Sequence, residues 1–149
     1  MKLSAVRGVV EGKRVAVVDD SIVRGTTSKQ IVKMLRDAGA KEVHMLISSP
    51  PFKFPCFYGI DVSTRSELMA AHYSVAAMRD KIGADSLNFL SVDNLVKAID
   101  VPDAGDAPYG GLTVAYFNGD YPTPLYDYED KYLASLNEQE RRERKERLA

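Results

Sequence analysis

The sequence predicts an α/β fold in which helices flank a parallel β-sheet, followed by a charged helical tail. Residues 15–18 form a short, continuous apolar run and residues 43–47 a second apolar run, which are typical of strands in a parallel sheet. Between them, apolar residues recur at helical spacing. From residue 129 onward the chain is rich in charged residues, which favours a solvated helix at the end.

The first strand–helix–strand unit covers residues 15–47. Its first strand, residues 15–18, is expected to be buried on both faces of the sheet. A helix is expected over residues 26–38, because Ile31, Met34 and Leu35 share one face, and Gly39 suits its C-terminal end. The second strand is expected at residues 43–47.

Residues 64–99 are predicted to form three more helices and one more strand. Thr64 and Glu67 have the spacing of a capping box, so a helix is expected from residue 64 to 69. A second helix is expected from Ser74 to Ile82, a strand at residues 87–90, and a third helix from Ser91 to residue 99. Leu95, Val96 and Ile99 are expected on the inner side of that third helix. Only three strands are visible, and a doubly wound sheet usually has five or six, so the chain resembles the second half of such a fold.

The last third of the chain divides into a loop and a tail. Residues 101–126 are rich in proline and glycine, which predicts loops with one strand at residues 113–117. We therefore divide the chain into residues 1–128 and a C-terminal helix of residues 129–149. Favourable pairs four residues apart are expected along this helix, namely Glu138/Arg142, Glu140/Arg144 and Glu143/Arg147.

Composition excludes several classes of protein. The 149 residues carry a formal net charge of -1, and dedicated nucleic-acid-binding domains are strongly basic. No apolar run approaches the roughly 20 residues that a membrane span requires. Cys56 is the only cysteine, so it forms no internal disulfide, and we expect a reducing, cytoplasmic location. His44 and His72 are expected to have structural roles.

The segment from Asp19 to Ser28 carries the chemistry. It lies between a strand and a helix, where open α/β sheets bind ligands. Backbone N–H groups at a helix start, a glycine and the hydroxyls of Thr26 and Thr27 form an anion site. Asp19 and Asp20 would repel a phosphate unless a sugar separated the charges, so the pattern predicts a site for a phosphorylated ribose, with Mg²⁺ reducing the repulsion.

Two other interpretations of these residues stay open. One is an ordinary strand–turn–helix with an aspartate cap. The other is a two-component receiver domain, in which the acid pair binds Mg²⁺ and Asp61 accepts a phosphoryl group. Against the receiver, Asp61 follows an aromatic loop rather than a clean buried strand, and Gly25, Thr26 and Thr27 would have no purpose.

The segment from Val18 to Ser28 resembles the phosphoribosylpyrophosphate (PRPP) signature of type I phosphoribosyltransferases, in the variant of the glutamine PRPP amidotransferase family. The segments 49–51, 55–61, 67–70, 90–93 and 117–123 are also similar to that family, and the resemblance covers roughly residues 5–130. It implies a type I phosphoribosyltransferase fold, here its C-terminal part. The implied activity is transfer of ammonia, released from glutamine, to C1 of PRPP in the first step of purine synthesis.

The resemblance also implies roles for individual residues. Asp19 and Asp20 would bind the ribose hydroxyls and Mg²⁺. The substrate-binding set for PRPP and for inhibitory purine nucleotides would be Asp19, Asp20, Ser21, Ile22, Val23, Arg24, Gly25, Thr26 and Thr27. A homo-oligomer is expected, without nucleic-acid or membrane partners.

The sequence also departs from the family. The N-terminal glutaminase domain and the early part of the transferase domain are absent, so we expect the chain to be truncated and inactive alone, with exposed sheet edge. Some members bind a [4Fe–4S] cluster through four cysteines; Cys56 alone cannot, so no cluster is expected, and Cys56 should be a buried apolar residue. Another PRPP-dependent transferase, or a PRPP-sensing regulator, remains an alternative function.

Overall fold

The computed structural model describes residues 4–60, 62, 64–100 and 107–148. Its sheet has three parallel strands in the order β1-β2-β3. The elements in chain order are α1 (Arg7–Val10), β1 (Arg14–Asp19), α2 (Thr26–Asp37), β2 (Glu42–Ile47), the 3₁₀ helix η1 (Arg65–Glu67), α3 (Met69–His72), α4 (Val75–Ile82), β3 (Ser86–Phe89), α5 (Val92–Ile99), η2 (Pro108–Gly111), α6 (Ala115–Asn118), η3 (Tyr126–Tyr128), α7 (Glu129–Ser135) and α8 (Glu138–Leu148).

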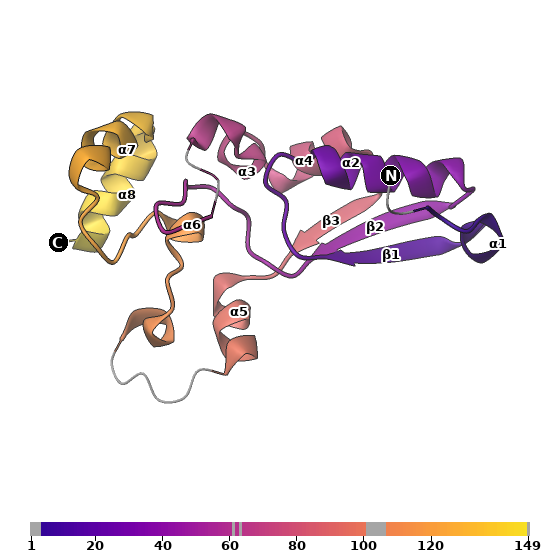
Figure 1. Cartoon of the computed structure of the whole chain (residues 1–149), viewed down its shortest axis with the longest axis horizontal. Helices are drawn as coiled ribbons and strands as arrows, with labels where there is room; N and C mark the ends of the chain where they lie inside the picture. The colour runs from indigo at the N-terminus through magenta and orange to yellow at the C-terminus, as the bar shows by residue number, and fades with distance from the viewer. Residues whose placement is uncertain (1–3, 61, 63, 101–106, 149) are drawn as a thin grey trace.

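The sheet and two helices form the main core. Helices α2 and α4 lie side by side on one face of the sheet, and all three strands run in the same direction (Figure 1). Val43, Met45 and Met78 are fully buried between them. The predicted α/β fold with flanking helices is thus confirmed.

The opposite face of the sheet is open, which corrects the expectation for the first strand. Exposed and half-buried residues alternate along β1, and Val18 is 73% exposed. Leu46 on β2, at 39% exposed, lies beside Val18 in the strand register. The apolar run of residues 15–18 suits a strand covered on both faces, but β1 is an edge strand with one covered face.

Two predicted helix starts are confirmed by their caps. Ser74 accepts a hydrogen bond from the Ala77 N–H at the start of α4, and Ser91 accepts one from Asn94 at the start of α5. Helix α5 nevertheless has no fully buried residue. Leu95 and Val96 are half-buried, whereas Ile99 is 50% exposed, so the expectation that all three face the interior is wrong for Ile99.

Two further expectations are corrected in the second half of the chain. Thr64 forms no side-chain cap, and the segment after it is a short 3₁₀ turn rather than one helix. Residues 113–117 do not form a strand: α6 spans Ala115–Asn118 and is capped by Gly119, which has a φ of 81°. An apolar run this short fits a strand or a helical turn equally well, and the left-handed Gly119 selects the turn.

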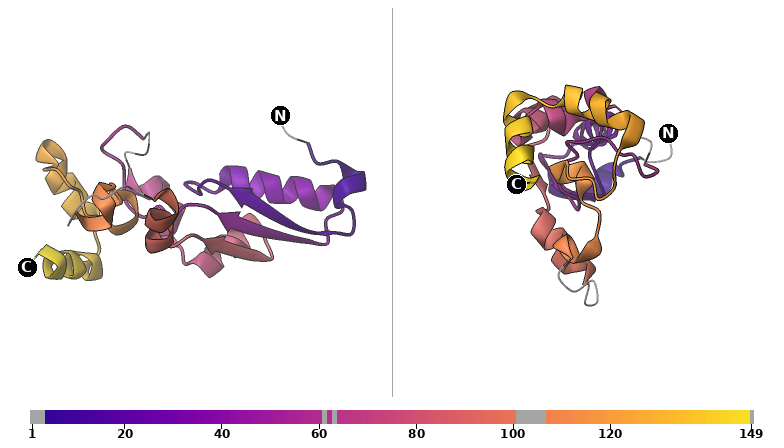
Figure 2. Two further views of the ribbon diagram at one scale, coloured as in Figure 1. Left: turned by 90° about the horizontal axis from the view of Figure 1, so that it is seen from below. Right: turned by 90° about the vertical axis from the view of Figure 1, so that its left-hand side faces the viewer.

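A second, aromatic core lies between the sheet and the tail. It consists of Phe54, Leu125, Tyr132 and Leu136, with Phe57, Tyr121 and Leu133 against it. Figure 2 shows α7 and α8 at one end of an elongated molecule and the sheet with its helices at the other. This aromatic core therefore attaches the C-terminal helices to residues 52–58.

The tail is two helices rather than one. The break falls at Leu136 and Asn137, where Asn137 and Glu140 form a reciprocal cap: each side chain accepts a hydrogen bond from the other's backbone N–H, both at 2.9 Å. The expected pair Glu140/Arg144 is absent, because Glu140 binds Arg65 and Arg144 binds Glu129. Glu143 accepts a hydrogen bond from Gln139, and the Arg147 side chain of the third expected pair lies outside the described residues.

Candidate functional site

The segment after β1 forms a concave loop. A cavity of about 260 Å³ is lined by ten consecutive residues, Asp19 to Ser28. Because parallel strands place their carboxyl ends at one edge of the sheet, this cavity lies where open α/β sheets bind ligands. All nine residues of the predicted substrate-binding set line it, so the structure brings them together at one place.

The two carboxylates of the loop are partly engaged by the backbone. Asp19 Oδ1 accepts the Asp20 N–H at 3.1 Å, and Asp20 Oδ1 accepts the Ser21 N–H at 2.6 Å. In the described part of the chain, the Oδ2 atom of each aspartate accepts no hydrogen bond. Each carboxylate therefore keeps one oxygen available for a sugar hydroxyl or a cation.

The loop also carries unpaired backbone donors. Gly25 has the left-handed φ of 77° and precedes the first turn of α2, which has no side-chain cap. Among the described residues, the N–H groups of Val23 to Ser28 donate to no acceptor. Unpaired N–H groups at the positive end of a 12-residue helix favour an anion such as a phosphate.

The structure places two further residues at this loop: Ser28, the last residue of the segment singled out in the sequence, and Ser48, which sequence reasoning missed. Ser28 lines the cavity and is only 2% exposed. Ser48 follows β2, and its N–H donates to the Asp19 carbonyl oxygen at 3.0 Å. Ser48 could have been found from its position, since it follows the strand next to β1.

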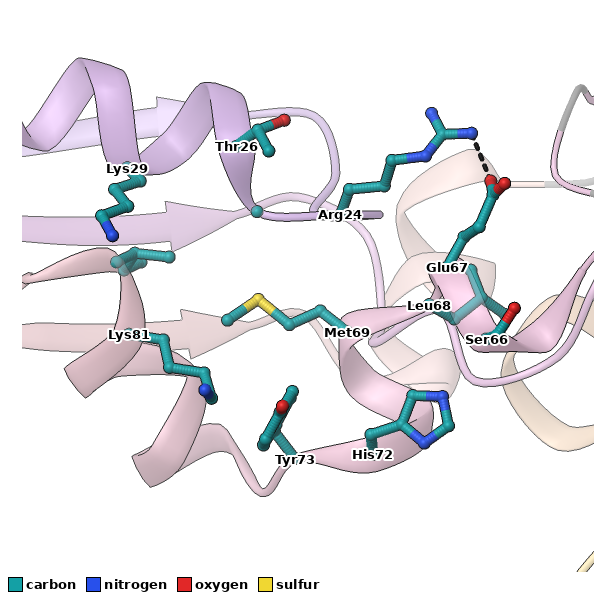
Figure 3. Close-up of a pocket in the computed structure, with 12 residues that line it drawn as sticks. Arg24, Thr26, Lys29, Ser66, Glu67, Leu68, Met69, His72, Tyr73 and Lys81 are labelled. Carbon is teal, nitrogen blue, oxygen red and sulfur yellow. Dashed lines mark hydrogen bonds and ion pairs between the residues drawn. The ribbon is translucent and has the colours of Figure 1, made fainter.

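A second cavity, of about 380 Å³, lies behind the same loop (Figure 3). It shares Arg24, Gly25 and Thr26 with the first. Its remaining lining is Lys29, Ser66, Glu67, Leu68, Met69, His72, Tyr73, Lys81 and Ile82. The Lys81 ammonium lies 4.2 Å from the centre of the Tyr73 ring. These residues were not predicted as part of a site, because they lie outside the motif, in or beside α2, η1, α3 and α4.

The acid pair fits a magnesium ion of the kind held jointly with a substrate. No group of three or more metal-ligating side chains occurs in the part of the chain that the structure describes. Protein-bound Mg²⁺ often takes only one or two carboxylates and completes its shell with substrate phosphates and water. Asp19 and Asp20, each with one unengaged oxygen, match that donor set.

Cys56 does not fit an iron–sulfur cluster. It is the only cysteine of the chain, and such clusters need several thiolate ligands. Its side chain is buried, as expected, and its sulfur accepts the N–H groups of Tyr58 and Ile60, both at 3.2 Å. Burial is the main cause that raises the pKa of Tyr116 to about 12, and its hydrogen bond with Cys56 is the second. Aromatic side chains fill the space beside this sulfur.

Three further expectations concern His44, Asp61 and membrane-spanning helices. His44 lies within β2 and is held by Ser86 at 2.9 Å and by Glu42 at 3.0 Å, which is a structural role. Asp61, the phosphoacceptor of the receiver alternative, lies outside the described residues. None of the helices within residues 4–60, 64–100 and 107–148 has the length and hydropathy of a membrane span.

Comparison with known proteins gives close relatives. No protein-family model matches the chain. The amidophosphoribosyltransferase of Staphylococcus aureus (strain N315) is 56% identical over 141 residues, and that of Bacillus subtilis (strain 168) is 59% identical over 138 residues. These matches cover 95% and 93% of this chain but only 28% of each relative, so the chain spans less than a third of their length.

Two solved structures are similar over most of the chain. The glutamine PRPP amidotransferase from B. subtilis, complexed with ADP and GMP, has a TM-score of 0.78 and 62% identity over 85% of this chain and 27% of its own. A structure described as the allosteric regulatory enzyme of purine biosynthesis has a TM-score of 0.80 and 57% identity, covering 92% of this chain and 29% of its own. Together with the sequence matches, they show that this chain is similar to amidophosphoribosyltransferases over most of its own length and corresponds to less than a third of theirs.

Proposed function

We propose that the chain provides the phosphoribosyl-binding part of an amidophosphoribosyltransferase. The observation that carries the proposal is the loop of residues 19–28, where unpaired N–H groups at a helix start lie beside two carboxylates around one cavity. The N–H groups suit a 5-phosphate, and the carboxylates suit adjacent ribose hydroxyls. The same combination suits a purine nucleotide, and the B. subtilis relative was solved with ADP and GMP.

The proposed reaction of the complete enzyme is displacement at C1 of PRPP. The nitrogen of ammonia forms a bond to C1 while the bond from C1 to the pyrophosphate oxygen breaks. Pyrophosphate leaves with the bonding electron pair, and the nitrogen gives up a proton. In this proposal Asp19 and Asp20 hold the ribose so that C1 is presented to the nucleophile, and residues 21–27 hold the 5-phosphate.

Magnesium belongs to the same proposal. Asp19 and Asp20 would hold the ion, which supplies positive charge to offset the phosphates of the substrate. A glutaminase domain as ammonia source, a homo-oligomer and a cytoplasmic location complete the proposal. The single cysteine, which suits a reducing compartment, supports the location.

A binding titration tests the proposal. The chain is titrated with ribose 5-phosphate and with AMP, with and without Mg²⁺, and the amide signals of residues 21–28 are followed by NMR. We expect saturable shifts in this loop, and much weaker ones with ribose, which lacks the phosphate. Asp19→Asn combined with Asp20→Asn should remove the Mg²⁺-dependent part of the binding.

The matched control is Asp93→Asn, which changes an exposed carboxylate in the first turn of α5. It should bind like the unchanged chain. The proposal fails if ribose 5-phosphate shifts no loop amide, or if the double aspartate variant and the control bind equally well with Mg²⁺.

A further inference from the structure

One wall of the second cavity described above contacts the loop of residues 19–28, which we call the phosphate loop after its proposed function. This wall is formed by η1 and the start of α3, and neither Glu67 nor Met69 lines the loop's own cavity. Both residues nevertheless contact the loop directly. Their contacts therefore reach that cavity through the loop.

Three successive loop residues are held by this wall. The Met69 N–H donates to the Val23 carbonyl oxygen at 2.8 Å. Glu67 forms an ion pair with the Arg24 guanidinium, and the two side chains point toward each other (Figure 3). The thioether of Met69 lies directly against Gly25, since a Cβ built on Gly25 would come within 2.6 Å of Met69 Sδ.

These contacts act on the part of the loop whose conformation decides anion binding. Gly25 sets the left-handed turn that leads into α2, so its position fixes the direction of the N–H groups of Thr26 and the residues after it. Met69 is 9% exposed and belongs to the main core, so it is a firm support. A loop held at three points loses less conformational freedom on binding a ligand.

The ion pair also decides where the Arg24 charge lies. Arg24 and Glu67 are half-exposed, at 53% and 41% of their side-chain surface, so the pair adds little stability to the fold. Without Glu67 the guanidinium would have no carboxylate partner among the described residues and would be drawn to other anions. The pair therefore orients the loop and contributes little to the stability of the fold.

We infer that Glu67 and Met69 are positioning residues for the phosphate loop, acting through Arg24 and Gly25. The expected effect of these two residues on sugar-phosphate binding rests on the proposed function. Their effect on the conformation of the loop does not, because it can be measured without a ligand.

The first measurement needs no ligand. Amide hydrogen exchange and ¹⁵N relaxation of the free chain are compared for the unchanged protein, Glu67→Gln and Met69→Ala. We expect faster exchange and greater mobility at residues 23–26 in both variants, with the middle of α2 unchanged. Met69→Leu, which keeps an apolar side chain of similar volume, should restore most of the order.

The second measurement follows ribose 5-phosphate binding. Glu67→Gln should weaken it about two- to fivefold, as loss of a half-exposed ion pair implies, and Met69→Ala should weaken it more. In an Arg24→Met background, Glu67→Gln should have no further effect, because its partner is gone. Glu138→Gln, an exposed carboxylate change in α8, is the control and should leave the dissociation constant unchanged.

The outcomes separate the two claims. If the unchanged chain binds no ribose 5-phosphate, the proposed function fails, and loop mobility alone still decides the role of the wall. If the chain binds, but Glu67→Gln and Met69→Ala leave both loop mobility and affinity unchanged, the positioning role is wrong. It is also wrong if the effects of Arg24→Met and Glu67→Gln simply add.

Discussion

Arg65 and Glu140, 75 positions apart in the sequence, form a bidentate ion pair between η1 and α8. The guanidinium also donates to the Ser135 carbonyl oxygen at 2.8 Å and lies 5.3 Å from the centre of the Phe54 ring. The two side chains are 9% and 19% exposed, so solvent screens this pair less than the other ion pairs of the described chain. Arg65 thus attaches the C-terminal helices to η1, whose Glu67 forms an ion pair with Arg24.

The first prediction concerns this attachment. Glu140→Gln should lower the free energy of unfolding by about 2 kcal/mol, because it leaves Arg65 without its charged partner. Urea unfolding and hydrogen exchange in α8 measure the effect. Glu143→Gln, a change to an exposed carboxylate on the same helix, should have little effect. Equal stability of the two variants would contradict the assigned role of Arg65.

The second prediction concerns pH. Burial alone would raise the pKa of Glu140, but hydrogen bonds from Arg65 and from the Asn137 N–H outweigh it and hold the pKa below 4.5. A lowered carboxyl pKa stabilises the fold above the unfolded value, and this stability is lost as the pH falls through the folded value. The stability difference between the unchanged chain and Glu140→Gln should therefore be full at pH 7 and shrink below about pH 4.5. A difference that stays constant down to pH 3 would contradict it.

The third prediction concerns the turn into α2. Gly25→Ala places a Cβ at a φ of 77° and against Met69, so the loop must rearrange. We expect ribose 5-phosphate to bind about tenfold more weakly or worse, since left-handed backbone costs an alanine about 1–2 kcal/mol. Gly8→Ala in α1, where a Cβ meets nothing within 4 Å, is the control. Unchanged affinity in Gly25→Ala would show that the turn is not part of the binding loop.

The fourth prediction concerns the aromatic region around Cys56. The chain, purified in air and treated with an iron chelator, should contain no stoichiometric iron and keep its thermal unfolding midpoint. The reason is that one thiol cannot hold a cluster, while Tyr121 donates to the Pro55 carbonyl oxygen at 2.6 Å and packs on Phe57. Metal analysis before and after chelation decides the matter, and a lowered midpoint after chelation would count against it.

The elements that carry their own local signals were predictable. Strand β2 and helices α2 and α4 follow from the apolar patterns and from Ser74 as a cap. The loop of residues 19–28 was also predictable, because its residues are contiguous and their types suit one chemistry. The break before α8 had a readable signal in Asn137 and Glu140, whose spacing is that of a capping box.

The rest depends on contacts between distant residues. The partner of Glu67 is Arg24 rather than Thr64, and the partner of Glu140 is Arg65 rather than Arg144. Local spacing suggested the wrong partner in each case, since it cannot show which side chain of another element approaches. The exposure of Val18 has a similar cause: an apolar run does not reveal whether a second layer covers it.

The edge position of β1 has a consequence for ligand capture. The outer rim of this strand is unpaired in the described chain, and Asp19 is its last residue. A polypeptide that docks there as an additional parallel strand would bring its own terminus next to Asp19 and Asp20. A polypeptide docked there and a ligand held by these carboxylates would then lie side by side, so the binding of each would depend on the other.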